Sequence, residues 1–402
     1  MLSWNDLSFE DKEEKVIVTL YKYFYKEFSK VEIEELGEYE IKENKLKLKK
    51  LDESASQKKF MRFFRKYKQD LLFKINGNKA IFVDEDMELP LIGLNFLGIL
   101  DKGSEILEIK PITGCNAGCN FCSVNEGFGT NKEIDFVVDK DYLVNETKAL
   151  LSFKQTNNIS LWLNPHGDPT LYSKLVEYCE EVIGDKHVKD IHIITNGLLL
   201  SKIMVDELVN VSKKHKKSIH ISLSMSGIEN AKKMMGPYYN LDLVLKNLDY
   251  ALDKLKVIIT PVWVHGMNDK DIKKLVLFAK EKKVNIAIQK FCKNKRGRNP
   301  VKELSWEKFF KDIKELEKET KHNLTQELGK IKETNQLPLI CNKKEKINVK
   351  VVCSGRRYND GLGVLENSKG RRAVALIGCD KNKKMAKAIV LSNKYNMILA
   401  KC

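Results

Sequence analysis

Three of the nine cysteines lie in one eight-residue run, CNAGCNFC, as Cys115, Cys119 and Cys122. This spacing is expected by chance in well under ~1% of chains of this length. Three thiolates so close together can bind three irons of a four-iron cluster, and the small residues Ala117 and Gly118 allow the loop to wrap around it. No fourth ligand lies nearby in the sequence, and an open coordination position is typical of a catalytic metal site. The alternatives are chance and a structural zinc site completed by a distant Cys or His.

The other cysteines are scattered and form no CxxC pair: Cys179, Cys292, Cys341, Cys353, Cys379 and Cys402. An auxiliary cluster built from Cys292, Cys341, Cys353 and Cys379 is therefore less favoured than ordinary buried thiols.

The elements that must position the cysteine run follow a regular βα pattern from residue 105 to about 291. Short runs rich in β-branched residues predict six strands: Ile106–Thr113, Ile159–Asn164, Asp190–Thr195, Ser218–Ser224, Val257–Val264 and Asn285–Phe291. Helical stretches are expected between them, near Asp139–Phe153, Tyr172–Ile183, Ser201–Lys214, Leu241–Leu255 and Lys270–Lys282. Right-handed crossovers then give a parallel sheet whose ligand site lies at the carboxyl ends of the strands. The cysteine run directly follows the first strand.

The run Thr113–Gly127 (TGCNAGCNFCSVNEG), placed at the end of the first strand of a six-fold βα unit, resembles the radical S-adenosylmethionine (radical SAM) superfamily. The resemblance covers about residues 105 to 291. It implies an α/β fold with a partial (βα)6 barrel, a [4Fe-4S] cluster held by Cys115, Cys119 and Cys122, and S-adenosylmethionine (SAM) bound to the open iron. One-electron reduction would then cleave SAM and give a 5′-deoxyadenosyl radical. The enzyme would be an oxidoreductase or a transferase.

The same resemblance implies contacts to SAM at other strand ends. His166, Gly167, Asp168 and Pro169 stand where the family has a Gly-Gly-Glu-Pro-like turn, with a histidine in place of glycine and a shorter acid; a plain turn is the other interpretation. The remaining expected cofactor contacts are Phe121, Thr195, Asn196, Ser222, Ser224 and Gln289. His265, in the turn after the fifth strand, and His166 are candidate proton relays. The apolar stretch Leu89–Gly98, CSVNEG and GDPTLY further resemble an archaeal subgroup of predicted iron–sulfur oxidoreductases.

The segments outside the barrel have less regular patterns. Residues 1–104 predict an α+β region, with an amphipathic helical pattern over Asp11–Ser29, a second helical run over Lys58–Leu72 and a strand at Ile81–Asp84. The apolar run Leu89–Asp101 is expected to be a joint or a docking surface. The barrel is assigned to residues 105–300, and a helical linker to 301–345, beginning near Trp306 with Ser305 as its cap. Short strands and turns over 346–402 predict a small β-barrel.

Positive charge is concentrated at the end of the chain. The net charge is +16, and residues 346–402 hold 13 basic against 3 acidic residues, a net +10. The simplest explanation of the positive net charge is that the whole chain is rich in lysine. However, six of the eight arginines also follow residue 290: Arg296, Arg298, Arg356, Arg357, Arg371 and Arg372. Arginine suits phosphate, and a small basic β-barrel resembles the TRAM and OB-like modules of RNA-modifying enzymes.

The sequence therefore favours a radical SAM enzyme that modifies RNA, in particular tRNA, through its basic C-terminal region. One alternative is a radical SAM enzyme acting on a peptide, protein or small metabolite. Another is an RNA-binding protein with a structural metal and no enzymatic activity. Reduction of the cluster implies an external one-electron donor such as ferredoxin or flavodoxin. No membrane association is expected, because no stretch of 18 or more uncharged apolar residues occurs. Met1–Glu10 lacks the pattern of a secretory signal, so a cytoplasmic location is predicted.

Overall fold

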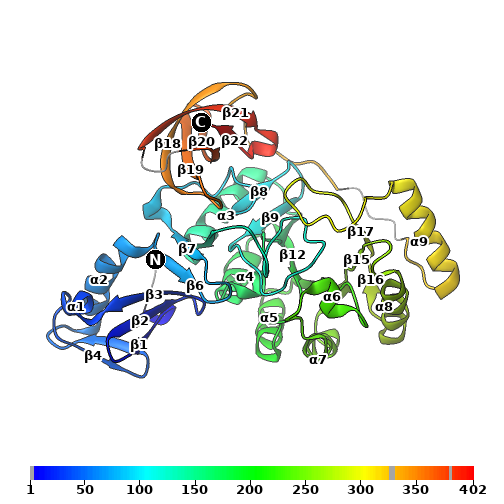
Figure 1. Ribbon diagram of the computed structural model, residues 1–402, viewed down its shortest axis with the longest axis horizontal. Helices are drawn as coiled ribbons and strands as arrows, with labels where there is room; N and C mark the ends of the chain where they lie inside the picture. Colours follow the sequence, from blue (N-terminus) through cyan, green and yellow to red (C-terminus); the bar gives the residue numbers. More distant parts are fainter. Residues whose placement is uncertain (1–3, 326–330, 380–382) are drawn as a thin grey trace.

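A computed structural model describes residues 4–325, 331–379 and 383–402, and its centre is a parallel sheet (Figure 1). Six parallel strands lie in chain order: β9 (Ile106–Lys110), β11 (Ile159–Leu163), β12 (Val188–Thr195), β13 (Ser218–Leu223), β14 (Lys256–Ile259) and β16 (Asn285–Ile286). An antiparallel strand, β8 (Gly98–Asp101), extends the edge beyond β9. The predicted partial (βα)6 barrel is confirmed.

The fifth and sixth predicted strands are each split in two. β14 and β16 are followed by a second parallel pair, β15 (Val262–Trp263) and β17 (Gln289–Lys290). The break after β14 contains Pro261, which has no N–H to donate to a sheet neighbour.

Helices occupy the crossovers close to the predicted positions. They are α3 (Lys140–Lys154), α4 (Leu175–Ile183), α5 (Lys202–His215), α6 (Ala231–Met235), α7 (Leu241–Leu252) and α8 (Asp269–Lys282). Side-chain caps fix several starts: Asp139, Ser201 and Asn240 accept hydrogen bonds from the first turns of α3, α5 and α7. Strand side chains such as Leu161, Ile191 and Ile219 are buried.

The N-terminal region differs from its prediction. The helical pattern proposed for Asp11–Ser29 is wrong: β2 (Lys15–Leu20) and β3 (Phe24–Ser29) form a hairpin there. Val16, Ile17 and Val18 are β-branched, and Tyr21 and Lys22 adopt the positive φ angles of a tight turn. The predicted run Lys58–Leu72 combines the end of α2 (Glu53–Phe64) with β6 (Leu71–Phe73). The remaining elements are β1 (Leu7–Asp11), α1 (Lys30–Glu34), β4 (Tyr39–Lys42), β5 (Lys45–Leu48) and β7 (Lys79–Val83).

The N-terminal sheet has the order β1-β2-β3-β6-β7-β10, and its last strand comes from far along the chain. β10 (Ile134–Val138) follows the cysteine run and pairs in parallel with β7. The segment that contains the cysteines is therefore held between two sheets, with β9 before it and β10 after it.

A closed five-stranded barrel ends the chain and lies above the parallel sheet in Figure 1. Its strands are β18 (Lys346–Ser354), β19 (Asp360–Asn367), β20 (Gly370–Ile377), β21 (Met385–Ser392) and β22 (Leu399–Lys401). The predicted small C-terminal β-barrel is confirmed. In the linker, α9 (Trp306–Thr320) begins at the predicted cap, Ser305, and no further helix occurs among its described residues; residues 326–330 lie outside them.

The apolar run at residues 89–101 contacts the C-terminal barrel through backbone hydrogen bonds. The backbone N–H groups of Ala373 and Ile398 donate to the carbonyls of Ile92 and Gly93, at 2.8 and 2.9 Å. A Cβ on Gly93 would come 2.1 Å from the oxygen of Ala373, so the close approach requires glycine. Within the described part of the chain, no helix is both long and apolar enough to cross a membrane.

Candidate active site

The three clustered cysteines open onto a cavity of about 480 Å³ at the carboxyl ends of the parallel strands. Residues from the ends of β11 and β12 and from β17 line it together with the cysteine loop. This is the position at which parallel α/β sheets bind ligands.

The donor groups around the cysteine sulfurs fit an iron–sulfur cluster. The backbone N–H groups of Ala117 and Glu126 point at the Sγ atoms of Cys115 and Cys122, at 3.4 Å each, and the side-chain amide of Asn196 lies 3.6 Å from Cys115 Sγ. Such N–H donors stabilise thiolates that bind iron. Burial raises the pKa of the Cys115 and Cys119 thiols, that of Cys119 to about 12, so cluster assembly must displace their protons.

The spread of the sulfurs argues against a single zinc ion. Among the described residues, these three sulfurs do not all lie within 4.8 Å of one another. Ligands of one tetrahedral zinc would be about 3.8 Å apart, given Zn–S bonds of roughly 2.3 Å. The wider spacing fits a four-iron cluster, whose thiolates bind different irons.

Two distant segments fasten the cysteine loop. Backbone N–H groups of Gly118 and Asn120 donate to the carbonyls of Met235 and Met234 at the end of α6. On the other side, the Arg298 guanidinium donates to the carbonyls of Cys119 and Phe128 and to Asn125 Oδ1, at 2.9, 2.6 and 2.8 Å. Sequence analysis counted Arg298 among the arginines suited to RNA phosphate, but the hydrogen bonds of its guanidinium go to the cysteine loop and the residues after it.

The HGDP turn is joined to the same loop through two glycines. Gly114 N donates to His166 O and Asp168 N donates to Gly114 O, both at 3.1 Å. Gly167 has φ +155°, and a Cβ there would lie 1.9 Å from Gly114 O. Only glycine at 167 allows this contact.

The Asp168 carboxylate accepts hydrogen bonds from other residues of the protein. It accepts hydrogen bonds from Thr170 N and Oγ1, Thr195 Oγ1 and Asn196 N, between 2.5 and 3.0 Å, and caps the short 3-10 helix η4 (Pro169–Leu171). Burial raises the pKa of Asp168, and the Asn196 and Thr170 donors oppose this shift. Asp168 thus ties the end of β11 to the end of β12, in addition to lining the cavity.

Most residues predicted from the sequence converge on this cavity. Its lining includes Cys115, Cys119, Phe121, Cys122, His166, Gly167, Asp168, Thr195, Asn196, Ser224 and Gln289. Two predicted contacts do not line it: Pro169 is buried in the first turn of η4, and Ser222 lies on β13, two residues short of Ser224.

The two candidate proton relays lie in different places. His166 lines the cavity, and burial together with the cations Lys110, Lys132 and Arg356 lowers its pKa well below the usual value, so it is neutral at pH 7. His265 instead stacks on Trp263 at 4.3 Å between ring centroids and lies 3.2 Å from Asp312 of α9. The proposed relay role of His265 therefore has no support in its position.

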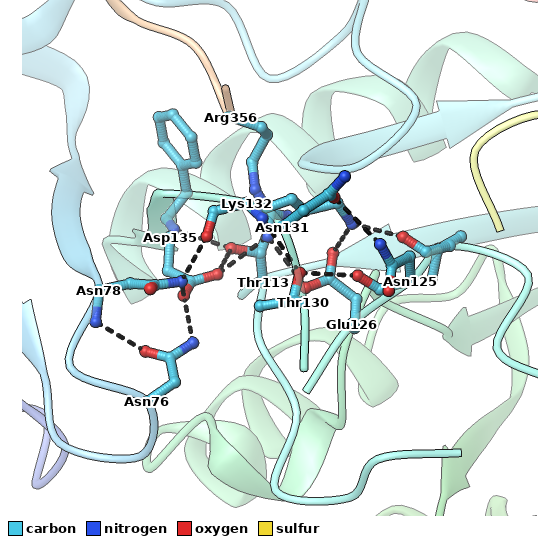
Figure 2. Close-up of polar contacts among 12 residues, drawn as sticks. Asn76, Asn78, Thr113, Asn125, Glu126, Thr130, Asn131, Lys132, Asp135 and Arg356 are labelled. Atoms are coloured by element: carbon cyan, nitrogen blue, oxygen red, sulfur yellow. Dashed lines mark hydrogen bonds and ion pairs between the residues drawn. The ribbon is translucent and has the colours of Figure 1, made fainter. Parts of the chain in front are cut away.

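A buried charge network includes Glu126, which follows the last cysteine of the loop by four residues (Figure 2). Arg356, in the connection between β18 and β19, donates from Nη2 to Glu126 Oε2 at 2.9 Å and to Asp135 Oδ1 at 3.0 Å. Lys132 forms an ion pair with Glu126, and Thr113 Oγ1 donates to Asp135 at 2.8 Å. The network connects the C-terminal barrel, the cysteine loop and β10. Sequence analysis missed Glu126, Lys132 and Asp135, because isolated charged residues carry no spacing signal.

The scattered cysteines do not converge. Cys292 lines the cavity, whereas Cys341, Cys353 and Cys379 are buried in or beside the C-terminal barrel and Cys179 is buried in α4. Among the residues that the structure describes, a compact group of possible metal ligands occurs elsewhere, at Asp190, His192 and His220.

Comparison with known proteins agrees with this geometry. Residues 109–279 match the family model of the radical SAM superfamily. The uncharacterized protein MJ0103 of Methanocaldococcus jannaschii is 29% identical over 366 residues, which cover 82% of each chain. The GTP 3′,8-cyclase of Thermodesulfovibrio yellowstonii is 26% identical, over 58% of this chain and 66% of the cyclase.

A solved structure of a spore photoproduct lyase mutant, with bound AdoMet and dinucleoside spore photoproduct, matches 61% of this chain and 79% of its own with 11% identity and a TM-score of 0.46. When bound, the cluster and SAM supply a radical that abstracts hydrogen from a substrate. The cysteine loop at the end of the first parallel strand and the family model that matches residues 109–279 together identify this part of the chain as a radical SAM domain, of the superfamily that uses a [4Fe-4S] cluster and SAM.

Proposed function

We propose that this radical SAM enzyme modifies RNA, with tRNA as its substrate class. One observation carries the proposal: the closed C-terminal barrel, whose segment has a net charge of +10, contributes residues directly to the wall beside the radical site. A polyanion bound by this barrel would thus lie next to the reacting centre.

The cations available to RNA are mainly lysines. Arg356 and Arg372 are buried, and Arg371 donates to Glu88 O and pairs with Glu366. Exposed lysines, in contrast, flank or lie on β21: Lys384, Lys387 and Lys394. Lys394 lies over the ring of the exposed Tyr395, 5.0 Å from its centroid, and an aromatic ring beside a cation is suited to nucleic acid.

A free nucleotide is the second candidate substrate. The relatives named GTP 3′,8-cyclase act, by that name, on a nucleoside triphosphate. This candidate belongs to the small-metabolite class that the sequence left open. A peptide substrate has no comparable support from the residues around the site.

We also propose that a ferredoxin- or flavodoxin-like protein supplies the electron. The basic surface suits such an acidic partner, and radical SAM chemistry requires one-electron reduction. Methyl or sulfur transfer, ring rearrangement and oxidation all begin with the same radical, and the donor does not distinguish them.

The experiment that tests the RNA proposal compares the nucleosides of total tRNA by mass spectrometry in cells with and without the protein. We expect one modified nucleoside to disappear and to return with the wild-type chain but not with Cys122→Ala. Unchanged tRNA nucleosides, in cells that otherwise accumulate an altered nucleotide or peptide, would contradict the proposal.

A second experiment tests the binding surface. Deleting residues 346–402 would also remove Arg356 from the site, so neutral substitutions are preferable. The triple variant Lys384→Gln, Lys387→Gln and Lys394→Gln should weaken tRNA binding. It should also lower the slope of log K against log salt by about one for each phosphate that the protein no longer neutralises. An unchanged slope would exclude this surface.

A further inference from the structure

A second cavity, of about 610 Å³, lies between the C-terminal barrel and the radical SAM domain. Its walls come from the loop at residues 93–96, the cysteine loop, the segment 294–296 and the barrel strands β19, β20 and β22. Separate parts of the chain thus enclose one space.

This cavity adjoins the active-site cavity. Ser123, Val124, His166 and Asn294 line both. A molecule bound in the second cavity would therefore lie beside the active-site cavity and the cysteine loop.

The charges that line the second cavity are unbalanced. Lys132 and Arg356 are paired with Glu126 and Asp135 in the buried network. The other lining charges are Lys295, Arg296 and Arg357 against the single acid Asp360, a surplus of two positive charges. Burial raises the pKa of Asp360, and the charges of Arg296 and Arg357 oppose this shift. Within the described ranges, neither arginine has a side-chain hydrogen bond or ion pair.

Arg356 supplies unused donors in the same wall. Its side chain is only 7% exposed, and its Nε and Nη1 atoms have no hydrogen-bond partner among the described residues. Buried guanidinium donors without partners are costly, so a small shift of this side chain toward an anion in the cavity would be favourable.

The rest of the lining is apolar. Leu94 and Phe96 lie on one side, and Leu362, Leu376 and Ile398 of the C-terminal barrel lie on the other. The cavity therefore offers cations at one part of its wall and an apolar surface for the flat body of a ligand at another.

We propose that this cavity binds the reacting nucleotide of the substrate, with Arg296 and Arg357 on its phosphate and Arg356 beside them in the wall. The surplus charge matches one phosphate group, and arginine binds phosphate oxygens through two parallel hydrogen bonds. The inference rests on the proposed function for a nucleotide of RNA, and the same chemistry would bind the phosphate of a free nucleotide.

The test uses the full chain with its reconstituted cluster and the double variant Arg296→Gln, Arg357→Gln. The matched control is Arg65→Gln, Arg371→Gln, which removes the same charge from exposed positions that do not line either cavity. Anaerobic calorimetry measures the binding of adenosine, guanosine, cytidine and uridine, of their 5′-monophosphates, and of bulk tRNA. Iron content and thermal midpoint verify that both variants are folded and loaded.

We expect the cavity variant to bind the phosphorylated probe at least tenfold more weakly than the control, with nucleoside binding changed less than twofold. If the cavity variant binds only tRNA more weakly, the phosphate belongs to RNA. If it binds only a monophosphate more weakly, the phosphate belongs to a free nucleotide. Equal affinities of the two double variants, or no binding of any phosphorylated probe to the wild type, would overturn the inference. The RNA proposal fails separately, when tRNA nucleosides are unchanged in cells.

Discussion

Arg298 provides a sharp test of how the cysteine loop is held. Replacing it by alanine removes three hydrogen bonds from the guanidinium to the loop. Since the side chain is half-buried, each bond contributes roughly 1 kcal/mol, or about 3 kcal/mol together. At about 1.4 kcal/mol per factor of ten, the closed loop should lose roughly a hundredfold in population relative to open forms.

The assay measures iron. After anaerobic reconstitution, Arg298→Ala should retain less iron per chain than the wild type and should release it to a chelator up to about a hundred times faster. The matched control is Arg296→Ala, whose side chain makes no hydrogen bond to the described part of the loop, and it should load and release iron like the wild type. If Arg298→Ala retains iron as well as the control does, the reasoning is refuted.

Three further predictions concern the scaffold. Gly167→Ala should prevent cluster loading without preventing expression, since its Cβ would collide with Gly114 O; iron analysis after reconstitution checks this, and normal loading would contradict it. Lys154→Met should lower the thermal midpoint, with a loss of about 3–5 kcal/mol, because it leaves the buried Asp101 carboxylate unpaired; an unchanged midpoint would show that the pair is not needed. Burial and His192 lower the pKa of His220 to about 4, below its unfolded value of roughly 6.5, so stability should fall as the pH decreases through that window. For this half-buried ring the free energy of unfolding should fall by roughly 1–2 kcal/mol between pH 7 and pH 4.5. Urea unfolding of His220→Gln at these two pH values should not show this part of the fall.

The partial barrel could be predicted from sequence because its strands are buried on one face and repeat at regular intervals. Runs such as Ile191–Ile194 combine β-branched residues with a helix on each side, and Ser305 caps α9 as the pattern predicted. The breaks inside the fifth and sixth strands were not predicted, although Pro261 marks the first of them in the sequence.

The N-terminal sheet could not be predicted in the same way. The segment Asp11–Ser29 is rich in charged residues, but half of these charges lie at residues 11–14, before β2, and the mixture of charged and apolar residues resembled an amphipathic helix. The last strand of this sheet, β10, pairs in parallel with β7 across the whole segment that holds the cysteines, and a pair formed over such a distance leaves no local signal.

The residues of the site divide in the same manner. Residues at strand ends, such as Thr195 and Ser224, could be located because the topology brings strand ends together. The roles of Arg298 and Arg356 could not, because a sequence shows positive charge but not whether a buried acceptor already uses it. Asp168 shows a related limit, since its carboxylate has four internal donors that only the fold reveals.

The measurement that tests the central claim most directly is the formation of 5′-deoxyadenosine from SAM by the reconstituted protein, with and without bulk tRNA, under anaerobic reduction. We predict cleavage that requires Cys115, Cys119 and Cys122 and that increases when tRNA is present. Cleavage at the same rate with and without tRNA would contradict an RNA substrate, and a fully loaded protein that forms no 5′-deoxyadenosine would contradict the radical SAM activity itself.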